Sequence, residues 1–173
     1  MVVKRIYPLF LAAAAIAAAK PAAVVKYLPP AAFPELPDKV VSQLQGRKCM
    51  IPQFPKGWTI SDRINVTRGE FQKAGQKDWA VVCATATEVT LLIYWNASEK
   101  DPAELPVGDR NTYWFTGLIP QELLKRKYAD KLPDVKLDHD GIGITNATEQ
   151  TTIQFFQDGK WSSFRGVPID TSR

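Results

Sequence analysis

The two cysteines of this chain, Cys49 and Cys83, restrict its fold more than any other sequence feature. A disulfide between them closes a loop of about 34 residues and stabilises the folded state by roughly 3 to 4 kcal/mol on the chain-entropy model. Such a bond persists in an oxidising compartment. The alternative is two unpaired thiols. A metal site is less favoured still, because no histidine or third cysteine lies nearby in the sequence.

Residues 1–19 have the parts of a secretory signal peptide. Lys4 and Arg5 precede an apolar run that ends in small residues at Ala17–Ala19, an A-x-A type of cleavage site. The run is shorter than the roughly 20 residues that a helix needs to cross a bilayer. The alternatives are an uncleaved N-terminal anchor and a buried Ala-rich helix. We therefore expect a bacterial protein, periplasmic or secreted, with no stable membrane anchor after cleavage.

The charge of the chain does not point to a nucleic acid. The net charge is +4, and cleavage of residues 1–19 lowers it to +2 because Lys4 and Arg5 are lost with no acidic residue. The basic run Lys125–Lys127 is interpreted as the solvated end of a short helix. No Lys/Arg cluster is interleaved with aromatic residues, so nucleic acid is not expected as a partner.

Composition divides the rest of the chain into two parts. Residues 20–37 are rich in proline and alanine, which favours extended polyproline conformations, and we interpret them as a flexible segment. Residues 38–173 are long enough for a single domain with its own core. Within this domain, Asp38 is predicted to cap a short helix that Gly46 ends.

Apolar and alternating runs predict an antiparallel sheet. The expected strands are Ile64–Phe71, Asp78–Cys83, Val89–Trp95, Thr151–Gln157 and Lys160–Phe164. An Asp-Gly turn joins the last two. Residues 96–110 are predicted to be a surface loop and Pro120–Tyr128 a second helix. The predicted fold class is α+β, with an antiparallel sheet of about five strands, two short helices packed on one face, and one disulfide.

The sharpest polar cluster is Asp138-His139-Asp140, which contains the only histidine. A carboxylate beside an imidazole can raise its basicity and fix its tautomer, and such side chains can also bind a divalent ion. Asp138, His139 and Asp140 are therefore the candidate catalytic residues, and Asp138 and Asp140 the candidate metal ligands. Adjacent residues of an extended chain point to opposite faces, so the alternative is a turn in which the aspartates bond to backbone amides.

Aromatic residues supply the second candidate site. Tyr113-Trp114-Phe115 follows a polar loop and is expected to border a binding cleft, since aromatic side chains anchor both cores and recognition surfaces. In alternating strands, about half of such side chains face inward. The other aromatic residues weighed for core or surface roles are Trp58, Trp79, Tyr94, Trp95 and Trp161.

Residues 68–82 resemble the repeat of FG-GAP propeller blades. The framework positions of that repeat are matched by Gly69, Phe71, Gly75, Asp78, Ala80 and Val81. In the family, Asp and Asn side chains of the loop bind calcium. Here Glu70, Lys73 and Gln76 stand in or near the ligand positions, which removes the charge that a Ca²⁺ site needs. The resemblance implies a strand-turn-strand shape without the metal.

Five further pieces are spread over most of the chain. They are C-x-I-P-Q (Cys49–Gln53), N-V-x-R-G-x-F (Asn65–Phe71), D-x-A-V-x-C (Asp78–Cys83), D-H-D-G-I (Asp138–Ile142) and G-x-W (Gly159–Trp161). Together they resemble a group of uncharacterised exported proteins from soil bacteria such as acidobacteria. The resemblance implies export and the cysteine pair, and it implies no particular activity.

The sequence favours a non-enzymatic role, as an exported binding or structural module. Neither a G-x-S-x-G elbow nor an H-E-x-x-H helix is present, so enzymatic activity is unsupported. The alternative function is a small hydrolase or metal-dependent protein centred on Asp138, His139 and Asp140. We expect no cofactor, and the expected partner is a protein or carbohydrate ligand.

Overall fold

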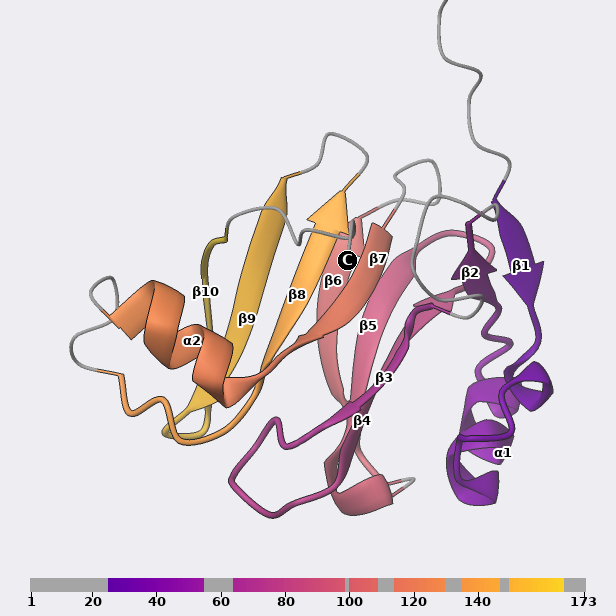
Figure 1. Ribbon diagram of the computed structural model, residues 1–173. Helices are drawn as coiled ribbons and strands as arrows, with labels where there is room; N and C mark the ends of the chain where they lie inside the picture. The colour runs from indigo at the N-terminus through magenta and orange to yellow at the C-terminus, as the bar shows by residue number, and fades with distance from the viewer. Residues whose placement is uncertain are drawn as a thin grey trace, which may run out of the picture.

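The computed structural model describes residues 25–54, 64–98, 100–108, 114–129, 135–146 and 150–166. The predicted signal peptide, residues 1–19, lies outside them. The described residues form ten strands and two α-helices (Figure 1). Among them, no helix has the length and apolar character needed to cross a membrane.

The strands of the described residues form three antiparallel sheets. The β1–β2 sheet consists of β1 (Lys26–Leu28) and β2 (Ile51–Gln53). The β3–β6 sheet follows chain order and contains β3 (Val66–Gly69), β4 (Asp78–Ala84), β5 (Val89–Tyr94) and β6 (Ala103–Gly108). The β7–β10 sheet has the order β10-β9-β8-β7 and contains β7 (Trp114–Ile119), β8 (Gly141–Asn146), β9 (Thr151–Gln157) and β10 (Lys160–Arg165). The helices are α1 (Asp38–Gly46), α2 (Gln121–Tyr128) and the 3-10 helices η1 (Pro30–Ala32) and η2 (Trp95–Ala97).

The predicted fold class, α+β with one antiparallel sheet and both helices on one face, is wrong. The described residues are mostly β, and α1 and α2 lie on opposite outer sides of the two four-stranded sheets (Figure 1). The layers follow the order α1, β3–β6 sheet, β7–β10 sheet, α2. The physical reason is that the β3–β6 sheet buries both of its faces, so it needs a cover on each side.

The central strand β4 shows how this double cover arises. All seven of its residues are buried. Its odd-numbered residues, such as Val81, belong to an apolar cluster with α1 and β2. Its even-numbered apolar residues, such as Val82, belong to a second cluster that includes Ile142 and Ile144 of β8. Because side chains alternate between the faces of a strand, β4 contributes to two separate cores.

Helix α2 covers the outer face of the β7–β10 sheet. Its buried residues, Leu124 and Tyr128, share a cluster with Ile153 and Phe155 of β9. At Gly141, where β8 begins, an added Cβ would lie 3.3 Å from a methyl of Leu124. The absence of a side chain there lets the helix pack closely against the sheet.

A strand occupies part of the loop predicted at residues 96–110. Strand β6 pairs with β5, with a shift of register between Val89 and Thr90. Pro106 lies in β6, where it is tolerated because β6 forms the edge of its sheet in the described residues. The prolines that indicated a loop are therefore compatible with an edge strand.

The flexible segment predicted at residues 20–37 also differs from the structure in its described part. Residues 25–37 contain β1 and η1. Phe33 and Leu36 are 1% and 4% exposed and pack in the same cluster as α1. Burial of these two side chains anchors a segment whose composition alone indicated a linker.

Both helices begin just after a proline. Pro37 is the N-cap of α1, and Asp38 is the first residue of the helix, so the predicted N-cap is displaced by one residue. Pro120 likewise precedes α2, which begins at Gln121. Gly46 is the last residue of α1, as the sequence predicted.

The predicted disulfide between Cys49 and Cys83 is confirmed. Their Cα atoms are 5.0 Å apart, and the two residues are 2% and 3% exposed. Cys49 lies between α1 and β2, whereas Cys83 lies in β4. The bond therefore ties the α1 layer to the central sheet from within their shared core.

Candidate functional site

Asp140 joins three segments at the start of β8. Its carboxylate accepts hydrogen bonds from the backbone N–H groups of Glu70 and Gln121, each at 3.0 Å. Its own N–H donates to the carbonyl oxygen of Glu70, also at 3.0 Å. Gln121 is the first residue of α2, where a carboxylate satisfies a free N–H and complements the helix dipole. Asp140 thus holds the turn after β3 and the start of α2 against β8.

The ring of His139 is part of the core. The residue is 5% exposed and stacks on Phe155 of β9, with ring centroids 4.3 Å apart and planes 3° from parallel. Its Nδ1 lies 3.0 Å from the carbonyl oxygen of Asp140, and its Nε2 lies 3.9 Å from a carboxylate oxygen of Asp138. An imidazole held in this way presents little surface to a substrate.

Asp138 is the exposed member of the cluster. Its carboxylate lies 2.9 Å from the ammonium group of Lys136. The hydrogen bond from Lys136 lowers the pKa of Asp138 below its ordinary value, and the same bond raises the pKa of Lys136. Ion pairs between exposed side chains contribute little to stability, so this contact is a surface feature.

The three predicted site residues do not converge on one point. Asp140 faces backbone amides, His139 faces Phe155, and Asp138 faces Lys136. Within the described part of the chain, no group of three His, Cys, Asp or Glu side chains is placed to hold a metal ion. The bonds of Asp140 match the alternative interpretation of this segment, a turn in which an aspartate bonds to backbone amides.

The aromatic candidate site lies partly outside the described residues. Tyr113 and Trp58 fall outside them, and only the backbone of Trp114 is described, at the start of β7. Phe115 is half-buried and meets Phe54 edge to face, with centroids 6.4 Å apart and planes at 84°. Since Phe54 follows β2, this contact joins the β7–β10 sheet to the β1–β2 sheet.

Four of the other aromatic residues lie in or beside the core. Trp79 and Tyr94 are 8% and 0% exposed. Trp95 of η2 stacks on Trp161 of β10, with centroids 5.8 Å apart and planes at 16°, and Phe156 lies within 5.3 Å of both rings. The rings of Trp95, Phe156 and Trp161 contact one another, so they link η2, which follows β5, to the β7–β10 sheet.

An open pocket of about 400 Å³ lies beside the disulfide, where the sequence indicated no site. Its lining residues are Arg47, Lys48, Met50, Ala84, Thr85, Ala86 and Thr87. The cysteine pair is the signal that predicts this grouping, because Lys48 and Met50 flank Cys49 and Ala84 follows Cys83. Once the disulfide is assumed, these residues must lie close together.

The charges near this pocket are partly neutralised. Arg47 pairs with Glu104 at 2.5 Å. The buried hydroxyl of Tyr94 donates a hydrogen bond to the side chain of Gln43. Burial raises the pKa of Tyr94 well above its ordinary value, Arg47 opposes that rise, and Glu104 adds to it. Lys48 remains an exposed cation of the pocket.

Residues 68–82 fold as strand, turn and strand, with β3 and β4 paired antiparallel. Asp78 is fully buried and accepts hydrogen bonds from the N–H groups of Phe71 and Gln72 at 2.9 and 3.0 Å. The carboxylate of Glu70 accepts a bond from the N–H of Gly75 at 2.8 Å. The acidic side chains of this turn therefore hold its backbone in shape.

Comparison with other proteins assigns neither a family nor a function to this chain. The chain matches no protein-family model, no curated protein and no solved structure. The resemblances to FG-GAP blades and to exported proteins of soil bacteria therefore stay predictions.

Proposed function

We propose that this chain is an exported protein, periplasmic or secreted, that serves as a binding or structural module. The buried Cys49–Cys83 disulfide is the observation that carries the proposal. Disulfides persist in oxidising compartments and are rare where thiols are kept reduced. A bond enclosed in a core is part of the fold, in contrast to exposed bonds that exchange readily. The signal-peptide pattern of residues 1–19 supports the same destination.

The position of His139, the only histidine in the sequence, supports a role other than catalysis. A general acid or base must reach the reacting proton within a hydrogen bond. His139 is stacked in the core, and both carboxylate oxygens of Asp140 accept backbone hydrogen bonds. The alternative function, a small hydrolase or metal-dependent protein centred on Asp138, His139 and Asp140, gains no support from these contacts.

The test is expression of the full chain in a bacterium, followed by fractionation and intact mass measurement. We expect a periplasmic or secreted product whose mass corresponds to loss of residues 1–19, to within a few residues. The mass should be lower again by the hydrogens that are lost when the disulfide forms. The double variant Cys49→Ser/Cys83→Ser is the control, since it should be cleaved but show no such deficit. A full-length cytoplasmic product with free thiols would contradict the proposal.

A further inference from the structure

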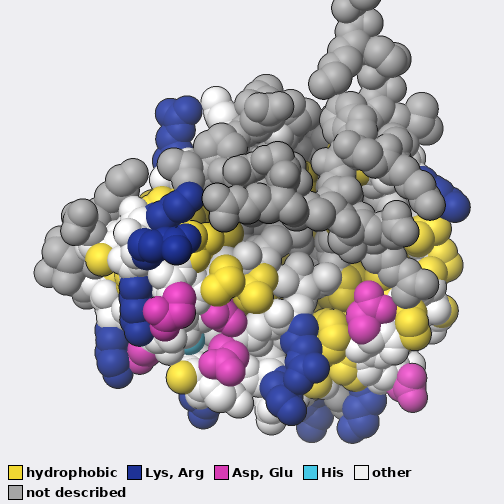
Figure 2. All heavy atoms as spheres, viewed as in Figure 1, with side chains coloured by type: hydrophobic (Ala, Val, Ile, Leu, Met, Phe, Trp, Pro, Cys, Tyr) yellow, Lys and Arg dark blue, Asp and Glu magenta, His cyan; other side chains and the backbone are white. Residues whose placement is uncertain are grey.

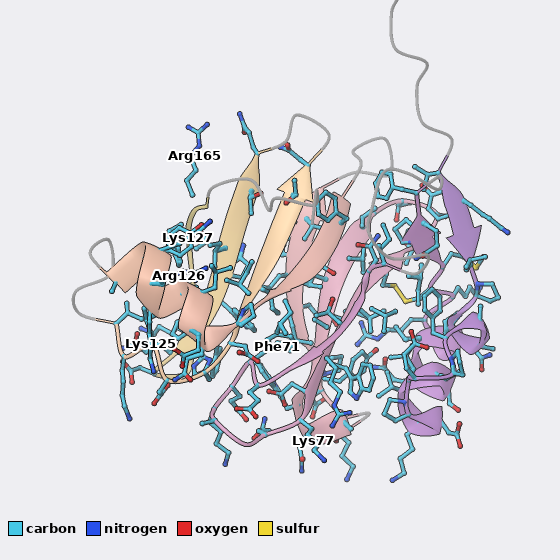
Figure 3. All side chains as sticks on the ribbon, viewed as in Figure 1. Phe71, Lys77, Lys125, Arg126, Lys127 and Arg165 are labelled. Carbon is cyan, nitrogen blue, oxygen red and sulfur yellow. A yellow bond between two sulfur atoms is a disulfide. The ribbon has the colours of Figure 1, made fainter. Side chains whose placement is uncertain are left out.

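Strand β10 forms an open edge of the β7–β10 sheet. It pairs with β9 on one side, and among the described residues no strand pairs with its other side. Lys160, Ser162, Ser163 and Arg165 are exposed. Figure 1 shows β10 at the outer end of its sheet, and in Figure 3 the side chain of Arg165 projects away from the ribbon. An open edge offers unpaired N–H and C=O groups to another chain.

The other three edge strands of the two four-stranded sheets are less open than β10. Strands β3 and β7 lie against each other. Strand β6 contains Pro106, and its register with β5 is irregular. Proline and irregular pairing both keep a sheet edge from pairing with another chain. Strand β10 has neither feature, because its register with β9 is continuous from Lys160 to Arg165.

The hydrogen bonds between β9 and β10 identify the backbone groups that face outward. Gly166, directly after β10, donates to the carbonyl oxygen of Thr151, the residue opposite it. Hydrogen-bonded and non-hydrogen-bonded pairs alternate along an antiparallel ladder. The even-numbered residues of β10 therefore bond to β9, whereas the N–H and C=O groups of Trp161, Ser163 and Arg165 point away from it.

A second copy of β10 matches this edge when the two strands run antiparallel around Ser163. In that register Ser163 faces Ser163 of the second copy, and Trp161 faces Arg165 of the second copy. All three outward-facing residues of each copy are then paired, which gives six hydrogen bonds between the chains, two for each pair. A shift of the register by two residues leaves only two such pairs. The centred register is therefore the one that satisfies the whole edge.

The side chains of β10 also suit the centred register. Lys160 faces Gly166 of the second copy and Arg165 faces Trp161, so neither cation of the strand lies opposite another cation. Like charges directly opposite each other would destabilise the pairing. Trp161 and Arg165 lie on the same face of the sheet, where a guanidinium group beside an indole ring is favourable.

Charged side chains on α2 confine the contact to the strand edge. Lys125, Arg126 and Lys127 are exposed on this helix. They are labelled on α2 in Figure 3, and dark-blue side chains gather over the same region in Figure 2. Because charged residues are depleted at the buried centre of protein interfaces, the exposed surface of α2 is a poor docking face. The backbone of β10 remains the group that a partner can pair with.

We infer that two copies of this chain associate through β10, so that their β7–β10 sheets join into one eight-stranded antiparallel sheet. The inference goes beyond the proposed function, because it concerns the assembly of the protein and not its compartment. The interface consists mainly of backbone hydrogen bonds along one short strand. Interfaces of small area are weak, so the dimer forms reversibly as the protein concentration rises.

The test is sedimentation equilibrium of the purified, oxidised protein over a range of concentrations, and we expect a monomer–dimer equilibrium. Ser163→Pro removes an outward-facing N–H from each copy and leaves the bonds to β9 intact. The dimer then lacks two hydrogen bonds, and dimerisation should weaken by roughly 30-fold or more. Ser163→Thr is the matched control, because it keeps the N–H and should dimerise like wild type. Near-UV circular dichroism shows whether each variant keeps the native fold.

Paired charges test the register. Ser163→Glu alone and Ser163→Lys alone place like charges opposite each other at the centre of the dimer, so each should dimerise more weakly than wild type. An equimolar mixture of the two variants should form heterodimers. Ser162→Glu and Ser162→Lys are the control pair, because Ser162 is also exposed but faces Phe164 of the second copy. Their mixture should dimerise no better than either variant alone.

Several results would overturn the inference. They are a monomer at every concentration, a monomer that instead binds an unrelated extended peptide, and dimers that Ser163→Pro leaves intact. Equal recovery in the mixtures at positions 162 and 163 would also overturn it, since the centred register would then be wrong. Because these assays use purified protein, their failure leaves the export test unaffected, and a cytoplasmic product in that test leaves dimerisation measurable.

Discussion

At the residue scale, single buried polar side chains hold different layers of this protein together. Asn65, next to β3, donates to the carbonyl of Pro52 in β2 and accepts from the N–H of Thr116 in β7, each at 2.8 Å. Asp78, at the start of β4, accepts from the N–H of Asn96 in η2 at 2.8 Å in addition to its bonds within the turn. Because a buried polar group is stable only when bonded, each of these side chains positions the segments around it.

Replacement of Asp140 by asparagine is expected to lower the free energy of unfolding by about 1 to 3 kcal/mol. The amide can accept only one of the two backbone hydrogen bonds, from Glu70 and Gln121, that the carboxylate accepts. Urea unfolding measures the loss. Asp138→Asn is the matched control, because it removes one charge from an exposed side chain and should cost less than about 0.5 kcal/mol. Equal losses of stability in the two variants would show that the removed charge, and not the lost backbone hydrogen bond, causes the effect.

Tyr94 predicts a loss of stability at alkaline pH. Burial raises the pKa of its hydroxyl above the ordinary value of about 10. Above that ordinary value the unfolded chain releases the proton while the folded chain keeps it. The free energy of unfolding therefore falls as pH rises from about 10 toward the raised pKa of the folded state. Urea unfolding at a series of alkaline pH values measures this fall, and the free energy of unfolding of Tyr94→Phe should depend less on pH than that of wild type. The same pH dependence in both proteins would show that other groups cause the fall.

At the scale of elements, the two four-stranded sheets come close where β7 lies against β3. Gly69 ends β3, and an added Cβ would lie 2.6 Å from the ring of Phe71 and 2.7 Å from a methyl of Leu118 in β7. Both distances are shorter than van der Waals contact. A glycine is therefore required for the two strands to approach at this point.

The variant Gly69→Ala is expected to destabilise the protein by about 1 to 3 kcal/mol, because the added methyl group would overlap with the fully buried ring of Phe71. Gly46→Ala, at the end of α1, is the control. Nothing lies within 4 Å of a Cβ added there, and the change should be neutral or stabilise the helix by up to about 1 kcal/mol. Thermal unfolding followed by circular dichroism distinguishes the two. Wild-type stability of Gly69→Ala would show that β3 and β7 separate at no cost.

At the scale of the whole molecule, apolar clusters join each layer of the described residues to the next. One cluster joins α1 and the β1–β2 sheet to the β3–β6 sheet, and a second lies between the two four-stranded sheets. A third lies under α2. The only cross-link among these residues, Cys49–Cys83, belongs to the first cluster. The attachment of the α1 layer therefore depends on a covalent bond as well as on burial.

The double variant Cys49→Ala/Cys83→Ala is expected to lose about 4 kcal/mol of stability on the chain-entropy model. The disulfide joins residues 34 apart in sequence, and its removal frees the unfolded chain of that constraint. Urea unfolding of the variant and of the oxidised wild type measures the difference. Wild type unfolded under reducing conditions is the control and should match the variant. A loss below about 1 kcal/mol would show that packing alone holds the α1 layer.

The sequence predicted the strands whose local residue patterns are strong. The runs that became β4, β5, β9 and β10 are rich in β-branched and aromatic residues, and Asp158-Gly159 turns between the last two. Strand β8 was missed because Gly141 and Gly143 weaken its pattern, and β6 because Pro106 indicated a loop. Those strands are stabilised by their neighbours in a sheet and not by local preference.

The sequence by itself determined the covalent and local features: the cysteine pair, both helices and the strongest strands. Only the tertiary structure decided that strands form two packed four-stranded sheets with a helix on each outer side. It also decided the role of Asp140, whose bonding partners Glu70 and Gln121 lie 70 and 19 residues away. Local conformation depends on near neighbours in the chain, whereas burial and hydrogen-bond partners depend on segments that meet only after folding.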